Sequence, residues 1–317
     1  MPRLKLDDPL SWAVLAALVM LWGSSFALLK VATVSIGPLW VATGRLWMAA
    51  LVLMLCWPFA RETFPPLSFK KDSPWVWYSG SAAISMTLPF FCFAYAAPRL
   101  PSAVSAICNG ATPIFAAILT VLFVKAEPLT RRKWAGIIMG FTGLVVLVGP
   151  SALTEFGSAS TVAELAALTA ALLYAIGAIL LRQAPPMGPV SGALVLAGSA
   201  AILSTLAALL FEGFPKQPQL DSLLATAALG IGPTGLALIG YVWLLNRRGT
   251  VFTTFATYLA PLWATGLGLL LLGERPGINA FFALALILGG VLIANANLAG
   301  LLPKGFSWTA LKRPSGD

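Results

Sequence analysis

The sequence predicts an all-α membrane protein with ten transmembrane helices, arranged as two related halves of five. Three observations predict this class. Hydrophobic residues occupy 59% of the 317 positions and charged residues only 10%, whereas soluble proteins carry about 25% charged residues. Apolar stretches of about 18 to 25 residues, enough to cross a hydrocarbon core of about 30 Å, recur along the whole chain. Landmarks of the first half also return in the second half in the same order.

The remaining composition excludes several classes of partner. The net charge is +9, but the basic residues lie in short connectors, as membrane topology requires, and form no solvated basic face for a nucleic acid. Cys56, Cys92 and Cys108 fall inside apolar segments and are interpreted as small buried hydrophobic residues. Histidine is absent, which removes the commonest metal ligand. We therefore expect no metal and no cofactor.

Turn-forming residues separate the expected spans of the first half. Gly37-Pro38 divides the first two spans, a polar connector covers 61–74, and Pro98 and Pro101 bracket a tight turn. Glycine and proline interrupt helices, so each of these features marks a boundary. The expected spans are 10–33, 38–60, 75–97, 102–124 and 133–148.

The second half follows a loop of small residues that contains Gly157, Ser158 and Ser160. Its expected spans are 161–181, 189–211, 221–245, 251–272 and 280–301, followed by a short basic tail. We therefore divide the chain into residues 1–152, which hold spans one to five, and residues 153–317, which hold spans six to ten and the tail.

Lys and Arg residues set the orientation, because the cytoplasmic connectors of membrane proteins are enriched in them. With the N-terminus inside, 15 of the 20 basic residues fall in cytoplasmic segments, and only Arg99, Lys216 and Arg275 fall in outer loops. The other two, Lys30 and Arg45, lie within spans. Both termini are therefore expected to be cytoplasmic, in an inner membrane of bacterial type.

An ordered set of landmarks relates the two halves. In each half a proline follows an arginine by fourteen residues, and a glycine follows a glutamate by sixteen. The equivalent pairs are Arg99 and Arg247, Pro113 and Pro261, Glu127 and Glu274, and Gly143 and Gly290, at offsets of 147 or 148 residues. Since five spans per half is an odd number, the second half must enter the membrane in the opposite direction. Inverted repeats recur in secondary transporters, which bind substrate at the repeat interface, although a duplication kept only for a stable bundle is the alternative.

The run LWGSSFALLK at 21–30, the Gly37-Pro38 turn, and Arg45 in the next span form one group of motif residues. Together with Glu127 and Glu274 they resemble the EamA repeat of the drug/metabolite transporter superfamily. Within this superfamily the chain is similar to aromatic amino acid exporters of the YddG type. The resemblance implies a ten-helix fold around a central cavity, and export of amino acids or other small metabolites.

Carboxylates are missing from the middle of the expected spans. Asp221 and Glu164 lie near span ends, and Glu127 and Glu274 close others. Proton-coupled carriers usually bury a carboxylate or histidine in the membrane, so the sequence favours facilitated diffusion or exchange over tight proton coupling. Because paired carboxylates and a metal-ligand cluster are also missing, we do not expect an enzyme.

Lys30 and Arg45 are the basic residues inside the expected spans. With a rise of about 1.5 Å per residue, Lys30 is expected near the outer end of its span and Arg45 about 10 Å below that surface. In one interpretation they attract the carboxylate of a substrate or line an outer gate. In the other they reach the interface or pair with Glu164.

Aromatic and small polar residues within the spans supply a candidate binding site. An amino acid needs hydrogen-bonding groups for its charged ends and an apolar wall for its side chain. Near span ends, Tyr and Trp also act as interfacial anchors, which is the alternative for Tyr78 and Trp243. The candidate substrate-binding residues are Trp22, Ser24, Ser25, Arg45, Tyr78, Tyr95, Asn109, Thr112, Tyr174, Tyr241, Trp243, Thr257 and Tyr258.

Prolines and glycines predict where helices bend and pack. Pro113 and Pro261 occupy equivalent repeat positions, and since proline kinks a helix and frees a carbonyl, we predict that both are hinges. Gly136, Gly140 and the pair Gly289-Gly290 are predicted close-packing surfaces.

These features predict an inner-membrane exporter of aromatic or neutral amino acids, or of similar small metabolites, that works by alternating access. The expected partners are a small-molecule substrate and the lipid bilayer, with the protein acting as a monomer or a homodimer. The nearest alternative is a drug or nucleotide-sugar carrier of the same superfamily, although a phosphate would need more basic residues. An intramembrane enzyme lacks a catalytic cluster here, and a receptor or assembly subunit would have larger soluble loops.

Overall fold

The computed structural model describes residues 8–123, 131–148, 159–215 and 217–295, and within these ranges it is helical, without strands. The helices before residue 150 are α1 (Pro9–Ala32), α2 (Pro38–Cys56), the short η1 (Trp57–Ala60), α3 (Pro74–Ala82), η2 (Ala83–Thr87), α4 (Leu88–Ala96), α5 (Ser102–Gly110), α6 (Thr112–Phe123) and α7 (Arg131–Val148). Those after it are α9 (Ala159–Gln183), α10 (Pro189–Phe211), α11 (Leu220–Leu229), η3 (Gly230–Leu236), α12 (Ala237–Leu271) and α13 (Ile278–Asn295).

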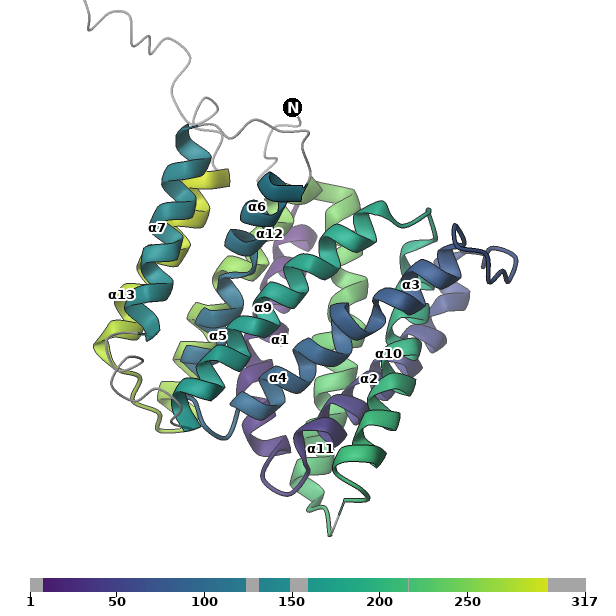
Figure 1. Ribbon diagram of the computed structural model, residues 1–317, viewed down its shortest axis with the longest axis horizontal. Coiled ribbons are helices and arrows are strands. Elements are labelled where there is room, and N and C mark those ends of the chain that lie inside the picture. The colour runs from purple at the N-terminus through teal and green to yellow at the C-terminus, as the bar shows by residue number, and fades with distance from the viewer. Residues whose placement is uncertain (1–7, 124–130, 149–158, 216, 296–317) are drawn as a thin grey trace, which may run out of the picture.

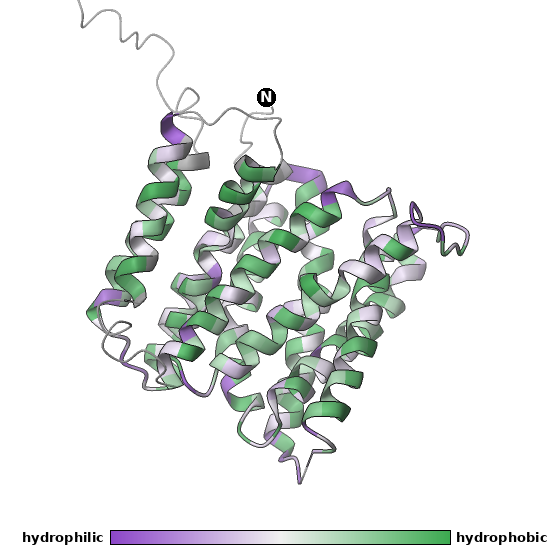
Figure 2. Cartoon of the chain, in the orientation of Figure 1, coloured by the Kyte–Doolittle hydropathy of each residue, from purple (hydrophilic) through white to green (hydrophobic). Residues whose placement is uncertain are grey.

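Most helical segments have the length and composition of membrane spans. Among the described residues, seven are long and apolar enough to cross a bilayer: 9–32, 38–60, 74–96, 102–120, 159–183, 189–211 and 220–249. Three shorter apolar helices lie at 134–147, 255–271 and 278–293. Figure 2 shows hydrophobic residues along the helices and hydrophilic residues gathered at helix ends and connectors. The prediction of an all-helical protein is therefore confirmed for the described residues.

The expected spans agree with the observed helices at one boundary and differ at another. The break expected between the eighth and ninth spans, at 246–250, contains a non-helical kink at Gly249, where two helical segments of α12 (Ala237–Leu271) meet. The backbone of Gly249 has φ 78° and ψ 175°, which only glycine adopts readily. The fourth expected span differs, because it is divided into α5 and α6 at Ala111. Pro113 lacks the N–H that would continue the hydrogen-bond ladder at this point, which accounts for the break.

Two π-helical turns, η2 and η3, interrupt helices at equivalent places in the two halves. Their first residues, Ala83 and Gly230, are 147 positions apart, which is the offset of the sequence repeat. Pro89 follows η2 by two residues, and Pro233 lies inside η3. A proline removes one donor and its ring meets the carbonyl four residues earlier, so the local ladder shifts from the α pattern. Turns of this kind occur frequently at functional sites.

The helices form a bundle in which the two halves of the chain intermix. The most extensive contacts pair α7 with α13, α1 with α12, α2 with α10, and α4 with α9. Figure 1 shows α7 beside α13 at one edge of the bundle and α2 beside α10 at the opposite edge. At the first of these edges, a β-carbon added to Gly290 would overlap the backbone of Gly136 and Gly140. These glycines therefore meet, as the sequence predicts.

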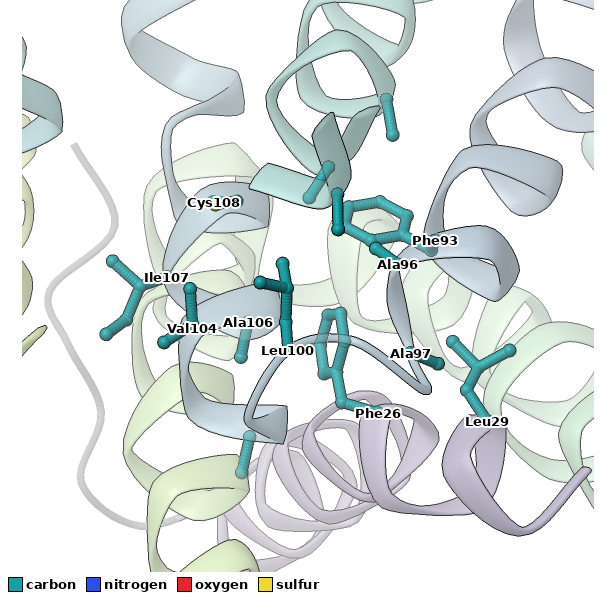
Figure 3. Close-up of a cluster of buried hydrophobic side chains, with 14 of the residues drawn as sticks. Phe26, Leu29, Phe93, Ala96, Ala97, Leu100, Val104, Ala106, Ile107 and Cys108 are labelled. Atoms are coloured by element: carbon teal, nitrogen blue, oxygen red, sulfur yellow. The ribbon is translucent and has the colours of Figure 1, made fainter. Parts of the chain in front are cut away.

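The largest buried cluster packs α1, α4 and α5 together. Phe26 and Leu29 of α1 lie in this cluster with Phe93 of α4, and the rings of Phe26 and Phe93 meet edge to face with centroids 5.6 Å apart. Figure 3 shows these residues near Val104 and Ile107 of α5. Because Phe26, Leu29 and Phe93 also line the cavity described below, the cluster supports one of its walls.

Two glutamates bind the N-termini of helices that belong to the other half. Glu212, which follows α10, accepts hydrogen bonds from the N–H groups of Leu39 and Trp40 at the start of α2, at 2.9 and 3.3 Å. Glu62, which follows η1, accepts two N–H groups at the start of α10, at 3.2 and 2.8 Å. The antiparallel helices α2 and α10 are thus connected at both ends.

Candidate functional site

A cavity of about 340 Å³ lies among helices of both halves. Its wall is mainly apolar and aromatic, with a few polar groups, and its volume falls within the range of small-molecule sites, roughly 300–1,000 Å³. Residues 1–152 contribute Trp22, Ser25, Phe26, Leu29, Arg45, Ser85, Met86, Phe90, Phe93, Asn109, Gly110, Thr112 and Pro113. Residues 153–317 contribute Tyr174, Pro233, Thr234, Leu238, Thr257, Tyr258 and Ala260.

Eight of the thirteen residues predicted to bind substrate line this cavity. They are Trp22, Ser25, Arg45, Asn109, Thr112, Tyr174, Thr257 and Tyr258. These residues come from α1, α2, α5, α6, α9 and α12, so the folded bundle is needed to bring them together. Of the two predicted hinges, Pro113 lines the cavity, whereas Pro261 adjoins the lining residue Ala260.

Among the described residues of the cavity wall, Arg45 carries the charge. Its side chain is buried, with the residue only 8% exposed, and its Nε donates a hydrogen bond of 2.8 Å to Oγ1 of Thr234 in η3. The guanidinium carbon lies 3.9 Å from the ring centroid of Phe90, a cation–π contact. A β-carbon added to Gly230 would overlap the carbonyl of Arg45, so this glycine allows η3 to approach α2 closely. The π-helical turn thereby positions the guanidinium.

Tyr174 of α9 forms part of the aromatic wall and packs against α4. Its ring stacks on Phe93, with centroids 6.1 Å apart, and meets Phe90 edge-on at 6.4 Å. Trp22 contributes another aromatic face, and its ring lies 5.7 Å from that of Tyr241. Aromatic pairs in these geometries are favourable beyond the area they bury. The wall is therefore rigid and suits an apolar or aromatic ligand.

A threonine next to a proline donates a hydrogen bond to a backbone carbonyl at two places in the cavity wall. Pro113 leaves the carbonyl of Asn109 without its usual donor, and the hydroxyl of Thr112 donates to it at 2.8 Å. Next to Pro233, the carbonyl of Leu229 accepts a hydrogen bond of 2.9 Å from the hydroxyl of Thr234. Since buried carbonyls need a partner, these threonines have a structural role. The Asn109 side chain is a different group and lines the cavity.

Five predicted binding residues do not line the cavity. Ser24 accepts a hydrogen bond of 3.0 Å from Trp263. Tyr78 packs against Gly192 of α10, where an added β-carbon would overlap the tyrosine ring. The guanidinium of Arg99 stacks over the ring of Tyr95, with its carbon 4.0 Å from the ring centroid. The other two, Tyr241 and Trp243, pack against the cluster of α1 and α12.

The pairing of Lys30 differs from the expected alternative. Lys30 forms an ion pair with Glu274, at 2.6 Å, so its predicted pairing with Glu164 is wrong. The same carboxylate accepts a hydrogen bond of 2.7 Å from the N–H of Ser102, at the start of α5. Its partner in the sequence repeat, Glu127, lies outside the described residues. Glu274 therefore joins α1, α5 and the end of α12.

Sequence reasoning missed the cavity residues of the π-helical turns and of α4. Ser85 and Met86 come from η2, Thr234 comes from η3, and Phe90 comes from α4. The prolines at 89 and 233 were the available signal, because proline inside a span disturbs the helix and re-aims nearby side chains. Hydropathy alone did not distinguish these residues from lipid-facing ones.

An all-helical membrane bundle whose two halves jointly enclose a small-molecule cavity is typical of membrane transporters. The EamA-like transporter family matches the chain twice, at residues 10–149 and 161–296. The chain belongs to this family.

Similar proteins are also transporters by name. The uncharacterized inner membrane transporter YedA of Escherichia coli is 24% identical over 89% of each chain. The aromatic amino acid exporter YddG of Ancylobacter novellus is 31% identical over 70% of this chain and 76% of its own. A S-adenosylmethionine/S-adenosylhomocysteine transporter of Chlamydia trachomatis is 28% identical over 86% of this chain and 85% of its own. These names point to a transporter rather than an enzyme.

A solved crystal structure shares the fold. It has a TM-score of 0.60 and 22% sequence identity, and the superposition covers 92% of this chain and 99% of the other.

Proposed function

We propose that this protein is an inner-membrane exporter of aromatic or neutral amino acids, or of similar small metabolites, that works by alternating access. The observation that carries the proposal is the cavity of about 340 Å³ with walls from both halves. A site at the junction of two halves is exposed to one side or the other when the halves rock. The eight predicted binding residues that line it form the proposed substrate site.

We also propose ten membrane spans in two inverted repeats, residues 1–152 and 153–317, with both termini in the cytoplasm. The two matches to the family support this division. The π-helical turns at the repeat offset and the paired caps of α2 and α10 support it further. Accessibility of single cysteines near residues 99 and 216 to an impermeant reagent in intact cells tests the orientation.

The proposed transport is not tightly coupled to protons. Within the described residues, no Asp or Glu lines the cavity. A proton-coupled carrier needs a group in or near the substrate path that binds the proton. Exchange or facilitated diffusion therefore fits the chemistry of the wall best.

A drug or a larger metabolite is the alternative cargo, and the S-adenosylmethionine transporter among the relatives illustrates that class. The cavity volume of about 340 Å³ lies at the lower end of the range for small-molecule sites, which favours a ligand of amino acid size.

Counterflow in proteoliposomes tests the proposal. Vesicles are loaded with unlabelled L-phenylalanine, and entry of the labelled compound is followed. Entry that requires the preload and the protein supports an amino acid carrier, with Trp22→Ala and Asn109→Ala reducing it and Phe59→Ala, an exposed residue outside the cavity, serving as the control. Absence of counterflow with every aromatic and neutral amino acid contradicts the amino acid assignment.

A further inference from the structure

The positive charge of Arg45 has no acidic partner in the part of the chain that the structure describes. There, the ion pairs join Lys30 with Glu274 and Arg247 with Asp8. Arg45 instead contacts a hydroxyl and an aromatic ring. Burying a charge without an opposite charge is unfavourable, so the free cavity is electrostatically incomplete.

The guanidinium is oriented and only partly used. Its Nε donates to Thr234, and Phe90 covers one face of the planar group. The two terminal nitrogens donate to no described residue, yet Arg45 lines the cavity. A guanidinium fixed in this way presents parallel N–H donors in its plane, which match the two oxygens of a carboxylate.

A second polar group in the wall also lacks a partner. Ser85 of η2 lines the cavity and is 9% exposed, and its hydroxyl has no hydrogen-bond partner among the described residues. Gly177 of α9 leaves the space for this hydroxyl, because a β-carbon there would meet its oxygen at 2.5 Å. Buried polar groups without partners are rare in proteins. The oxygen faces Gly177 and is closed off from the cavity, so the Ser85 side chain must rotate before it can donate to a ligand.

Among its described residues, the same wall offers no opposite charge for a cation. No described carboxylate lines it, and the rest of the surface is mainly aromatic and apolar, with Trp22, Phe93 and Tyr174 as its large faces. An α-ammonium group would meet aromatic rings and hydroxyls but no opposite charge. The charge balance of the site therefore favours an anion over a zwitterion.

We propose that the cavity recognises its substrate through a carboxylate bound to Arg45 and does not require an α-ammonium group, and that Ser85 becomes a second donor when its side chain rotates away from Gly177. The substrate class is then small aromatic or apolar monocarboxylates, a class that includes 2-oxo and 2-hydroxy acids and extends to the matching amino acids. This inference rests on the proposed function only in taking the cavity as the transport site.

Two analogues of phenylalanine, each lacking one charged group, separate the alternatives. 3-Phenylpropionate keeps the carboxylate, and phenethylamine keeps the ammonium. Binding to the purified protein in detergent is measured by tryptophan fluorescence, which avoids leakage of the free acid through vesicles. We expect 3-phenylpropionate to bind at least as tightly as phenylalanine, and phenethylamine to bind at least about tenfold more weakly, because a site built for a hydrogen-bonding group rejects analogues that lack it.

Variants test the assigned residues. Arg45→Gln is expected to weaken 3-phenylpropionate binding at least about tenfold and to leave phenethylamine binding unchanged or stronger. The selectivity ratio, which is the affinity for 3-phenylpropionate divided by that for phenethylamine, therefore falls. Arg45→Lys should restore part of the ratio through its charge, and Ser85→Ala should reduce it less. The matched control is Arg99→Gln, an exposed arginine that stacks on Tyr95 outside the cavity, and it should keep the ratio. Melting temperatures of all variants show whether they fold.

The outcomes distinguish this inference from the proposed function. The inference is overturned if phenethylamine binds tightly, or if Arg45→Gln does not change the selectivity ratio. If phenylalanine nevertheless shows counterflow, the amino acid carrier remains supported. Binding of 3-phenylpropionate without counterflow of any amino acid supports the inference and removes the amino acid assignment. If none of the three probes binds, the inference is overturned.

Discussion

The hydroxyl of Thr234 orients the guanidinium of Arg45 in the cavity wall. Thr234 accepts a hydrogen bond from Arg45 and donates its own proton to the carbonyl of Leu229. The donor direction is fixed because the carbonyl can only accept. The oxygen lone pairs of Thr234 are therefore left for Arg45, and the two bonds orient each other.

Thr234→Val removes this hydroxyl while keeping the shape of the side chain. The variant leaves the Nε of Arg45 without its acceptor and removes one donor to the Leu229 carbonyl, and an unsatisfied buried group costs about 1–3 kcal/mol. We expect a lower melting temperature in detergent and weaker binding of carboxylate ligands. Thr234→Ser, which keeps the hydroxyl, should stay close to wild type. Equal stability and binding in the valine variant would show that the hydroxyl does not orient Arg45.

Gly177→Ala tests the space beside Ser85. The added methyl group would press on the Ser85 oxygen and on its α-carbon, so we expect Ser85 and the part of η2 that carries it to shift. Binding of 3-phenylpropionate should weaken by a few-fold, and Ser85→Ala in the same background should have no further effect. The measurement is ligand titration of the four proteins, and additive losses would contradict the contact. Gly198→Ala, at a helical glycine with open space around it, is the control.

The reciprocal caps explain the glycines that precede α2 and α10. Carboxylates at helix N-termini satisfy free N–H groups and complement the helix dipole. A β-carbon on Gly37 would overlap the carboxylate of Glu212, and one on Gly188 would overlap that of Glu62. Glycine at these N-caps therefore leaves room for a capping carboxylate that comes from another part of the chain.

Glu212→Gln and Glu62→Gln each replace a charged cap by a neutral one. The amide has a single acceptor oxygen, so one of two N–H groups loses its bond, and the expected loss of stability is about 1 kcal/mol for each variant. Melting temperatures in detergent should fall for both and for Gly37→Ala. Asp72→Asn, at an exposed acidic residue, controls for the change in charge. If a cap variant had the same melting temperature as Asp72→Asn, the hydrogen bonds of that cap would not be stabilising.

The predicted hinges differ in their surroundings. Pro113 follows the break between α5 and α6, whereas Pro261 lies inside α12, and a β-carbon on Gly110 would lie 3.7 Å from the Pro261 ring. The two prolines therefore meet the same short segment, and bending there would change the cavity wall. A matching break at Pro261 is not present.

Pro113→Ala and Pro261→Ala test the hinge prediction. Alanine restores an N–H and allows a straighter, stiffer helix, so we expect slower counterflow with ligand binding in detergent largely retained. The double variant should be slowest. Transport at the wild-type rate in the double variant would remove both prolines from the conformational change.

For the whole molecule, the placement of carboxylates predicts how transport responds to pH. The described acidic residues serve as caps and ion-pair partners or lie near helix ends, and Glu164 of α9 is half-buried outside the cavity lining. We expect the same rate of counterflow with and without an imposed pH gradient, and Glu164→Gln should not change this result. A strict requirement for the gradient, lost in Glu164→Gln, would identify this residue as a proton site and reverse the conclusion.

The Asp8–Arg247 pair, which joins the start of α1 to α12, should be insensitive to pH in the same range. The hydrogen bond from Arg247, with help from Ser11, lowers the pKa of Asp8 from 3.8 to about 2. The folded pKa lies below the unfolded one, so the contribution is present above about pH 4 and is lost as pH falls through about 2. Asp8→Asn should therefore change the melting temperature equally at about pH 6 and about pH 8. If Asp8→Asn changed the melting temperature by different amounts at the two pH values, the lowered pKa of Asp8 would be contradicted.

The sequence by itself determined the membrane class and most of the helix positions. Hydropathy is a local property that the thickness of the bilayer imposes on each span, which is why the expected 189–211 coincides with α10 (Pro189–Phe211). The expected gap between residues 245 and 251 likewise contains the kink at Gly249. The repeat landmarks were also visible, because they are spacings along one chain.

Only the tertiary structure decided which side chains meet. Trp22 and Asn109 face the cavity while Ser24, one helical position from Ser25, does not, because the rotation of each helix is set by the neighbours it packs against. Arg45 donates to Thr234, which lies 189 residues away in a π-helical turn. Lys30 pairs with Glu274 instead of Glu164. In hydrocarbon, an apolar surface is equally stable against lipid or protein, so hydropathy cannot tell the lipid-facing side of a helix from the cavity side, and close packing of the two halves makes that distinction.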